Sequence, residues 1–282
     1  MEETPRCYRH PDRETLVSCS ECGRPICEEC MTFAPVGIRC PDHAGVGRAA
    51  SLSPARRARM AQRTVSRSEA PATMALVAVI VLVYIVTVVQ GAGISRPGGR
   101  VFEEGALVGV LVSDGEWWRL VGAMFLHASL LHLAFNTFAL YWLGSIVEAA
   151  LGTWRYLLLY FASGLAGSAG ALVFSGPFAI TVGASGAIFG LMGALLMLEY
   201  MATGSLAGQA MTLIVLNLVI TFAIPNISIG GHLGGLVGGT AATFALTKLR
   251  YVRPAFLAPA AVVAIGVASL VVAYVRVESY VF

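Results

Sequence analysis

Residues 127–152 read HASLLHLAFNTFALYWLGSIVEAALG, a mostly apolar stretch that carries two histidines, one asparagine and one glutamate. From residue 130 to residue 150 it has about the 20 residues that a helix needs to cross the hydrocarbon core of a bilayer. Polar groups at that depth are costly and usually face the interior of a helix bundle or a water-filled cavity. The stretch therefore predicts a membrane-spanning helix with His132 and Asn136 turned toward such an interior.

The whole chain has the composition of a membrane protein. Of its 282 residues, 57% are hydrophobic and 12% are charged, whereas charged residues make up about 25% of a soluble protein. Apolar stretches of spanning length follow one another after Pro71, and they must be helices because isolated strands cannot satisfy their backbone hydrogen bonds in lipid. The seven expected spans are 72–89, 130–150, 156–174, 182–198, 209–224, 229–246 and 255–275. The predicted fold is an all-α polytopic membrane protein.

Basic residues set the expected orientation. Of the 19 lysines and arginines, 11 lie within the first 70 residues. A cytoplasmic N-terminus puts nine basic residues at the inner ends of the spans and four at the outer ends, as the positive-inside rule favours. We expect a multi-pass protein of the plasma (inner) membrane, with the tail after Arg276 outside. The arginine-rich residues 46–70 are interpreted as a basic linker that contacts anionic lipid headgroups.

In this orientation the second, fourth and sixth spans all begin at the outer face. His132, Asn136, Ser185 and His232 lie near those beginnings, within about the outer 10 Å at about 1.5 Å of rise per residue. A serine hydroxyl is a weak nucleophile until a base such as a neutral imidazole accepts its proton. Ser185 and His232 can form this pair. His132 and Asn136, four residues apart on one helical face, can donate to a developing oxyanion.

Small residues recur every four positions in the fourth and sixth spans. These stripes consist of Gly186, Gly190 and Ala194 in the fourth span and of Gly231, Gly235 and Gly239 in the sixth. Such stripes allow helix backbones to approach closely in lipid, and a serine–histidine pair across two helices needs that approach. Because no aspartate occurs in any predicted span, we expect a dyad and not a triad.

At these residues the chain resembles the rhomboid family of intramembrane proteases. The resemblance covers about residues 71–250 and rests on five motifs. They are Trp118-Arg119, the segment from His127 to Asn136, Gly144-xxx-Glu148-xxx-Gly152, Gly183-Ala184-Ser185-Gly186, and His232 followed by Gly235 and Gly239. It implies a six-helix core around a water-filled cavity, to which this chain adds a seventh helix and a short tail at residues 251–282.

The resemblance also implies roles for individual residues. Ser185 would be the nucleophile, His232 the general base and then the acid, and His132 with Asn136 the oxyanion site, with no cofactor for catalysis. Phe189 departs from the many relatives that carry a tyrosine packed on the catalytic histidine, so the stacking is retained without the hydroxyl. The implied reaction is hydrolysis of peptide bonds in or near unstable transmembrane helices of membrane-protein substrates. We expect Glu148 to be a structural hydrogen-bonding residue.

Two other functions are compatible with part of this pattern. One is a catalytically silent relative that binds membrane proteins, although the presence of both Ser185 and His232 argues against it. The other is a small transporter with His132, Asn136 and His232 along a polar pathway.

The six cysteines all lie before residue 41, in four ligand pairs of one spacing. The pairs are Cys7-xx-His10, Cys19-xx-Cys22, Cys27-xx-Cys30 and Cys40-xx-His43. Eight such ligands suit two structural zinc ions. Three disulfides are the alternative, which a reducing cytoplasm disfavours. The interspersed acidic residues argue against nucleic-acid binding and favour a protein partner.

The order of these pairs resembles a B-box type zinc finger, over residues 1–45. Its interleaved arrangement would join Cys7, His10, Cys27 and Cys30 at one ion and Cys19, Cys22, Cys40 and His43 at the other. Sequential pairing is the other arrangement that the sequence allows. Metal binding is expected to supply most of the folding energy of so short a segment.

Overall fold

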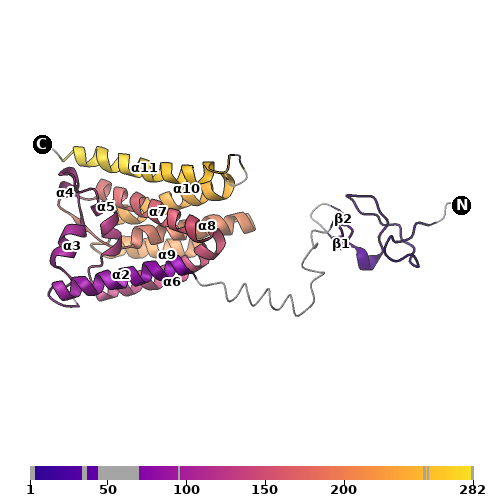
Figure 1. The fold of residues 1–282 in the computed structure, drawn as a ribbon, viewed down its shortest axis with the longest axis horizontal. Coiled ribbons are helices and arrows are strands. Elements are labelled where there is room, and N and C mark those ends of the chain that lie inside the picture. Colours follow the sequence, from indigo (N-terminus) through magenta and orange to yellow (C-terminus); the bar gives the residue numbers. More distant parts are fainter. Residues whose placement is uncertain are drawn as a thin grey trace. The chain divides into compact units, whose positions relative to one another are not determined.

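The computed structural model describes residues 4–33, 37–43, 70–94, 96–249, 252 and 254–280. The chain divides into two compact units, Met1–Arg67 and Ser68–Phe282, drawn in Figure 1. The arginines of the expected basic linker lie outside the described residues.

Among its described residues, the N-terminal unit contains turns, one 3-10 helix and one small sheet. The helix η1 spans Glu28–Cys30, and strands β1 (Thr32–Phe33) and β2 (Ile38–Arg39) pair antiparallel with Thr32 opposite Arg39. Its buried core contains Ile26 and five of the six cysteines. A unit of this size buries too little apolar surface to be stable on that basis alone.

Asp42 connects the first and last turns of this unit. Its carboxylate accepts hydrogen bonds from the Tyr8 hydroxyl (3.0 Å), Arg9 (2.9 Å) and Arg24 (3.2 Å). The hydrogen bond from Tyr8 and the positive charges of the two arginines hold the pKa of Asp42 below its ordinary value. The turn before His10 is therefore held against the turn before His43.

The second unit is a bundle of long helices (Figure 1). The helices are α2 (Pro71–Gln90), α6 (Leu130–Leu151), α7 (Thr153–Phe174), α8 (Ser185–Thr203), α9 (Gln209–Ala223), α10 (Ile229–Lys248) and α11 (Leu257–Glu278). Within the described ranges, five of them, α2, α6, α7, α8 and α11, are long and apolar enough to cross a membrane. Helix α9 has only 15 residues, and α10 contains six glycines that reduce its mean hydropathy.

The segment between α2 and α6 folds into short elements at one end of the bundle. They are α3 (Gly99–Gly105), β3 (Leu107–Val108), α4 (Gly109–Ser113), α5 (Arg119–Gly122) and the 3-10 helix η2 (Ala123–Phe125). Strand β3 pairs antiparallel with β4 (Ile180–Thr181), with Leu107 opposite Thr181. This pairing explains why α8 begins at Ser185 and not at residue 182 as predicted.

The buried side chain of Arg119 connects different parts of this segment. Its side chain is 4% exposed and forms an ion pair with Glu116 at 2.5 Å. It also donates hydrogen bonds to the carbonyl oxygens of Glu103 and Ala106, both at 2.7 Å. A buried charge is tolerated when it is paired and hydrogen-bonded in this way.

Glu148 performs a similar structural role at the opposite end of the bundle. Its buried carboxylate accepts hydrogen bonds from the backbone N–H groups of Ala72 and Thr73 and from the hydroxyls of Thr73 and Thr153. The backbone donors belong to the first turn of α2, where N–H groups have no intrahelical partner and a negative charge is stabilising. The expected structural role of Glu148 is thereby confirmed.

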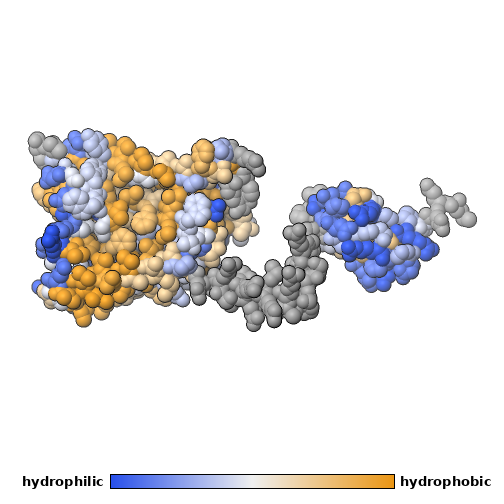
Figure 2. Space-filling view, viewed as in Figure 1, coloured by the Kyte–Doolittle hydropathy of each residue, from blue (hydrophilic) through white to orange (hydrophobic). Residues whose placement is uncertain are grey.

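The surface of the bundle is apolar over a wide band. Figure 2 shows this band, with hydrophilic residues gathered at the end that carries α3 and α4. Large apolar side chains stand out from the bundle, including Phe135 and Phe138 of α6 and Val275 of α11. Such a surface fits contact with lipid, and the chain is an integral multi-pass membrane protein.

Candidate active site and metal sites

Ser185 is the first residue of α8 and follows a sharply bent segment. Gly183 has a φ of +129°, a conformation that favours glycine. A Cβ atom placed on Gly183 would lie 2.8 Å from Cε1 and Nε2 of His132 and 3.7 Å from Oγ of Ser185. The absence of a side chain on Gly183 therefore allows the His132 ring to pack against the backbone beside the Ser185 hydroxyl. Because α8 begins here, its first N–H groups and the positive end of its dipole also lie close to Ser185.

The α8 and α10 backbones touch directly beside Ser185. A Cβ atom on Gly235 would lie 1.9 Å from the carbonyl oxygen of Gly186, and one on Gly186 would lie 3.3 Å from the carbonyl oxygen of Gly231. Gly186 follows Ser185, and Gly231 precedes His232. The glycine stripes thus bring the chain at Ser185 next to the chain at His232, as a catalytic pair requires.

The His232 ring is fixed by contacts from two other helices. Phe189, one turn after Ser185 on α8, stacks on it with a centroid separation of 4.0 Å and an interplanar angle of 19°. On α9, Oγ1 of Thr221 lies 2.7 Å from Nδ1 of His232. In the described part of the chain His232 is hydrogen-bonded to Thr221 and not to Ser185. The expected aromatic stacking is present.

Thr221 was not identified from the sequence. Its hydroxyl does not distinguish it there, because the same span also carries Thr212 and Asn217 and threonines in membrane helices commonly bond to their own backbone. No spacing rule relates residue 221 to residue 232, because the turn between α9 and α10 determines their approach.

His132 and Asn136 occupy the first turns of α6. Ser129 caps this helix by accepting a hydrogen bond from the His132 backbone N–H at 3.2 Å. Nδ2 of Asn136 donates to the His132 carbonyl oxygen at 2.9 Å, which leaves its second hydrogen for another acceptor. The His132 ring packs edge-on against the buried His127 ring with centroids 5.0 Å apart. Neither ring nitrogen of His127 has a hydrogen-bond partner among the described residues.

The eight cysteine and histidine ligands of the N-terminal unit gather in two clusters. One cluster is Cys7, His10, Cys27 and Cys30, and the other is Cys19, Cys22, Cys40 and His43. Within each, the candidate ligand atoms lie within 4.8 Å of one another. The grouping is interleaved and not sequential, and all six cysteines are free thiols.

The spacing of these atoms fits a tetrahedral metal site. Bonds of about 2.3 Å to sulfur and 2.1 Å to nitrogen give edges of about 3.8 Å between two sulfurs and about 3.6 Å between sulfur and nitrogen. Sγ of Cys22 and Cys40 are 3.8 Å apart, and Nδ1 of His10 lies 3.2 Å from Sγ of Cys27 and 3.4 Å from Sγ of Cys30. Two sets of three thiols and one imidazole suit zinc.

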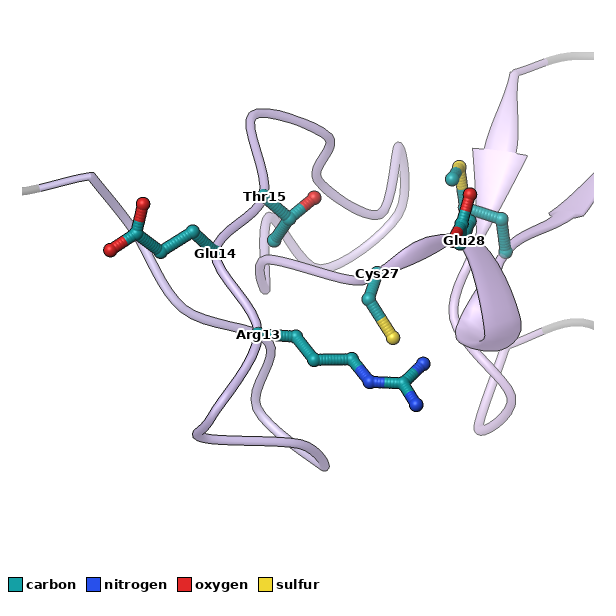
Figure 3. A pocket seen from close by; sticks show the side chains of 6 residues that line it. Arg13, Glu14, Thr15, Cys27 and Glu28 are labelled. Carbon is teal, nitrogen blue, oxygen red and sulfur yellow. The ribbon is translucent and has the colours of Figure 1, made fainter.

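An open pocket adjoins the first cluster. It is lined by Arg13, Glu14, Thr15, Cys27, Glu28 and Met31. Figure 3 shows the guanidinium of Arg13 extending toward Cys27, and Arg13 is also paired with Glu29 at 2.7 Å. A cation beside a site of three thiolates reduces its net negative charge.

Comparison with known proteins identifies one family. The family described as Rhomboid domain matches residues 114–249. The chain is 44% identical over 146 residues to the rhomboid protease GluP of Bacillus subtilis, covering 50% of this chain and 28% of that protein. It is 38% identical over 138 residues to the putative rhomboid protease YdcA of the same organism, covering 47% of this chain and 69% of that protein.

A plant relative extends the comparison. The chain is 38% identical over 165 residues to RHOMBOID-like protein 5 of Arabidopsis thaliana, covering 55% of this chain and 53% of that protein. The chain thus spans less than two thirds of the length of two of these three curated relatives.

Proposed function

Because this chain belongs to the rhomboid family, we propose that it is an intramembrane serine endopeptidase that cleaves membrane-protein substrates in or near their transmembrane helices. The observation that carries the proposal is the backbone contact of Gly186 with Gly231 and Gly235. It supports the proposal because it brings together the two helices that carry the proposed nucleophile, Ser185, and the proposed base, His232. The other functions compatible with the sequence, a silent binding protein or a transporter, do not require a serine and an imidazole beside that contact.

The proposed reaction proceeds in two halves. Oγ of Ser185 attacks the carbonyl carbon of the scissile bond while Nε2 of His232 takes the hydroxyl proton. The negative charge that develops on the carbonyl oxygen is stabilised by donors from the His132 ring, the Asn136 amide and the first N–H groups of α8. His232 then protonates the leaving amine. Water, activated by His232, hydrolyses the acyl–serine ester and regenerates the hydroxyl.

The proposed topology follows from the predicted spans and from the distribution of the basic residues. Residues 71–250 form the six-helix core and residues 251–282 a seventh helix with a short tail. The basic residues favour a cytoplasmic N-terminus in the plasma (inner) membrane, with Ser185 near the outer face. Substrates with weak transmembrane helices are favoured, because a regular helix hides its carbonyl carbons from a nucleophile.

Covalent labelling tests the catalytic proposal. The purified full chain in detergent, incubated with a single-span reporter, should cleave it, and a fluorescent serine-directed phosphonate should both stop cleavage and become attached to the chain. Peptide mapping should locate the label at Ser185. A chain that neither cleaves nor binds the phosphonate would support the silent or transporter functions instead.

For the N-terminal unit we propose a B-box-like domain at residues 1–45 that binds two structural zinc ions and a protein partner, followed by a basic linker at residues 46–70. The interleaved clusters and their tetrahedral spacing support this assignment. The alternation of Arg9, Arg13 and Arg24 with acidic residues, seen in their ion pairs, gives no uniformly positive face for nucleic acid.

Metal analysis tests the zinc assignment. The full chain purified without chelators should contain two zinc ions, and Cys7→Ser or Cys40→Ser should each remove one, because each variant breaks only one cluster. Glu14→Gln, an exposed change outside both clusters, is the control and should leave both ions bound. A zinc content near zero in the gently purified parent would refute the assignment.

A further inference from the structure

We propose that Thr221 is a positioning residue for His232, so that α9 contributes a third group to the Ser185–His232 pair. This inference rests on the proposed protease function. The contact that suggests it is the separation of 2.7 Å between Oγ1 of Thr221 and Nδ1 of His232. Both residues are buried, Thr221 at 2% and His232 at 8% exposure, so water does not compete freely for this hydrogen bond.

The direction of the hydrogen bond follows from a second contact of Thr221. Its Oγ1 also lies 2.7 Å from the carbonyl oxygen of Asn217, to which it donates. A hydroxyl has one hydrogen and two lone pairs. We assign this hydrogen to Asn217, so that Oγ1 accepts from His232, which then carries its proton on Nδ1.

This tautomer is the one that the proposed reaction needs. A neutral imidazole with its hydrogen on Nδ1 has its free lone pair on Nε2. Nε2 can then accept the proton of Ser185. The opposite tautomer would leave Nε2 with a hydrogen and unable to act as a base. A threonine that accepts from Nδ1 therefore selects the reactive form, as the aspartate does in a serine–histidine–aspartate triad.

The stack on Phe189 cannot make this selection by itself. A phenyl ring 4.0 Å from the imidazole restricts its tilt, but it can stack equally well on the opposite face when the imidazole turns over by half a rotation. That turn exchanges the positions of Nδ1 and the opposite ring carbon. A hydrogen bond at one edge of the ring distinguishes the two positions, so Phe189 and Thr221 together define one orientation of His232.

The contact of Thr221 with a histidine also sets it apart from comparable threonines. Thr243 and Thr247 on α10 are buried and likewise donate to the carbonyl four residues earlier. In the described part of the chain, neither of them is hydrogen-bonded to a histidine. The bond to the helix backbone is thus an ordinary feature of a buried threonine, whereas the second contact is particular to Thr221.

An uncharged hydroxyl is a suitable hydrogen-bond partner for His232, because the site is buried. A carboxylate in the same place would have to be buried beside a neutral imidazole, at a large desolvation cost. The hydroxyl accepts from Nδ1 in the neutral state and more strongly from the imidazolium that forms when Ser185 gives up its proton. Thr221 thereby stabilises the charged state of the base without a permanent buried charge.

Steady-state kinetics of the full chain in detergent test this role. Thr221→Val keeps the shape and removes the acceptor, and it should lower kcat by about tenfold to a hundredfold while leaving KM within about twofold of the parent. It should slow phosphonate labelling of Ser185 by a similar factor. Thr221→Ser restores the hydroxyl and should recover most of the loss. Thr247→Val is the matched control, because it removes a buried back-bonded hydroxyl that contacts no histidine.

The outcomes separate this inference from the proposed function. If Thr221→Val matches the parent in kcat and labelling, or if Thr221→Ser or Thr247→Val loses as much activity, the positioning role is wrong while the protease remains. If the parent itself does not cleave, the proposed function fails first. A measurement on the parent does not depend on how the Thr221 variants fold: ¹⁵N NMR of histidine-labelled protein, with the His232 signals assigned by comparison with His232→Ala, should find the hydrogen of His232 on Nδ1. A hydrogen on Nε2 would overturn the inference.

Discussion

Ser185→Ala and His232→Ala should each reduce cleavage of a single-span reporter by at least about 10⁴-fold, and the double variant should be no less active than either. Ser185 supplies the attacking oxygen and His232 accepts its proton, so removal of either leaves no route to the acyl intermediate. The residues act as one unit, and their effects are therefore not additive. Initial cleavage rates of the purified chains, followed by gel mobility of the product, provide the measurement.

A matched serine on another helix controls for changes in packing. Ser269→Ala on α11 removes a buried hydroxyl that donates to the Ile265 carbonyl oxygen, and it should keep the parent rate. Ser185→Ala should also unfold at nearly the parent temperature, because Ser185 is only partly buried. Cleavage by Ser185→Ala at a rate close to that of the parent would show that another group is the nucleophile.

The positions of the long helices could be predicted because length and hydropathy determine them. The expected span 130–150 corresponds to α6 at Leu130–Leu151, and 209–224 corresponds to α9 at Gln209–Ala223. The start of α8 was predicted three residues too early, because hydropathy cannot distinguish an apolar extended segment from a helix. Ile180 and Thr181 pair with β3, and the positive φ of Gly183 then ends the extended segment.

The candidate site could be predicted only for residues whose type and spacing form a recognisable motif. Ser185, His232 and the glycine stripes were recognised because their residue types and spacing are unusual in an apolar helix. The interleaved clustering of the cysteine and histidine pairs agrees with the B-box resemblance. Thr221 and Asp42 left no such signal, because their roles depend on turns that bring distant segments together.

The contact between α8 and α10 depends on the absence of side chains at a few positions. A Cβ atom on Gly235 would lie 1.9 Å from the carbonyl oxygen of Gly186 and 2.6 Å from its carbonyl carbon. These are backbone atoms, which cannot turn aside as the end of a flexible side chain can. Ordinary contact would require the two helices to separate by about 1.5 Å. This separation would increase the distance between the segments that carry Ser185 and His232.

Gly235→Ala should therefore lower kcat/KM by at least about a hundredfold, because a displacement of about 1 Å between reacting groups costs that much. It should also destabilise the chain by about 1–3 kcal/mol, the usual cost of overpacking. Gly266→Ala on α11 is the matched control: it is a buried helical glycine whose added Cβ would meet only Cδ1 of Leu165, at 3.6 Å. That variant should keep full activity and gain up to about 1 kcal/mol from helix propensity. Reporter cleavage and thermal unfolding of the two variants, measured side by side, test this prediction. If Gly235→Ala behaves like Gly266→Ala, the close approach of α8 and α10 is not what brings the base to the nucleophile.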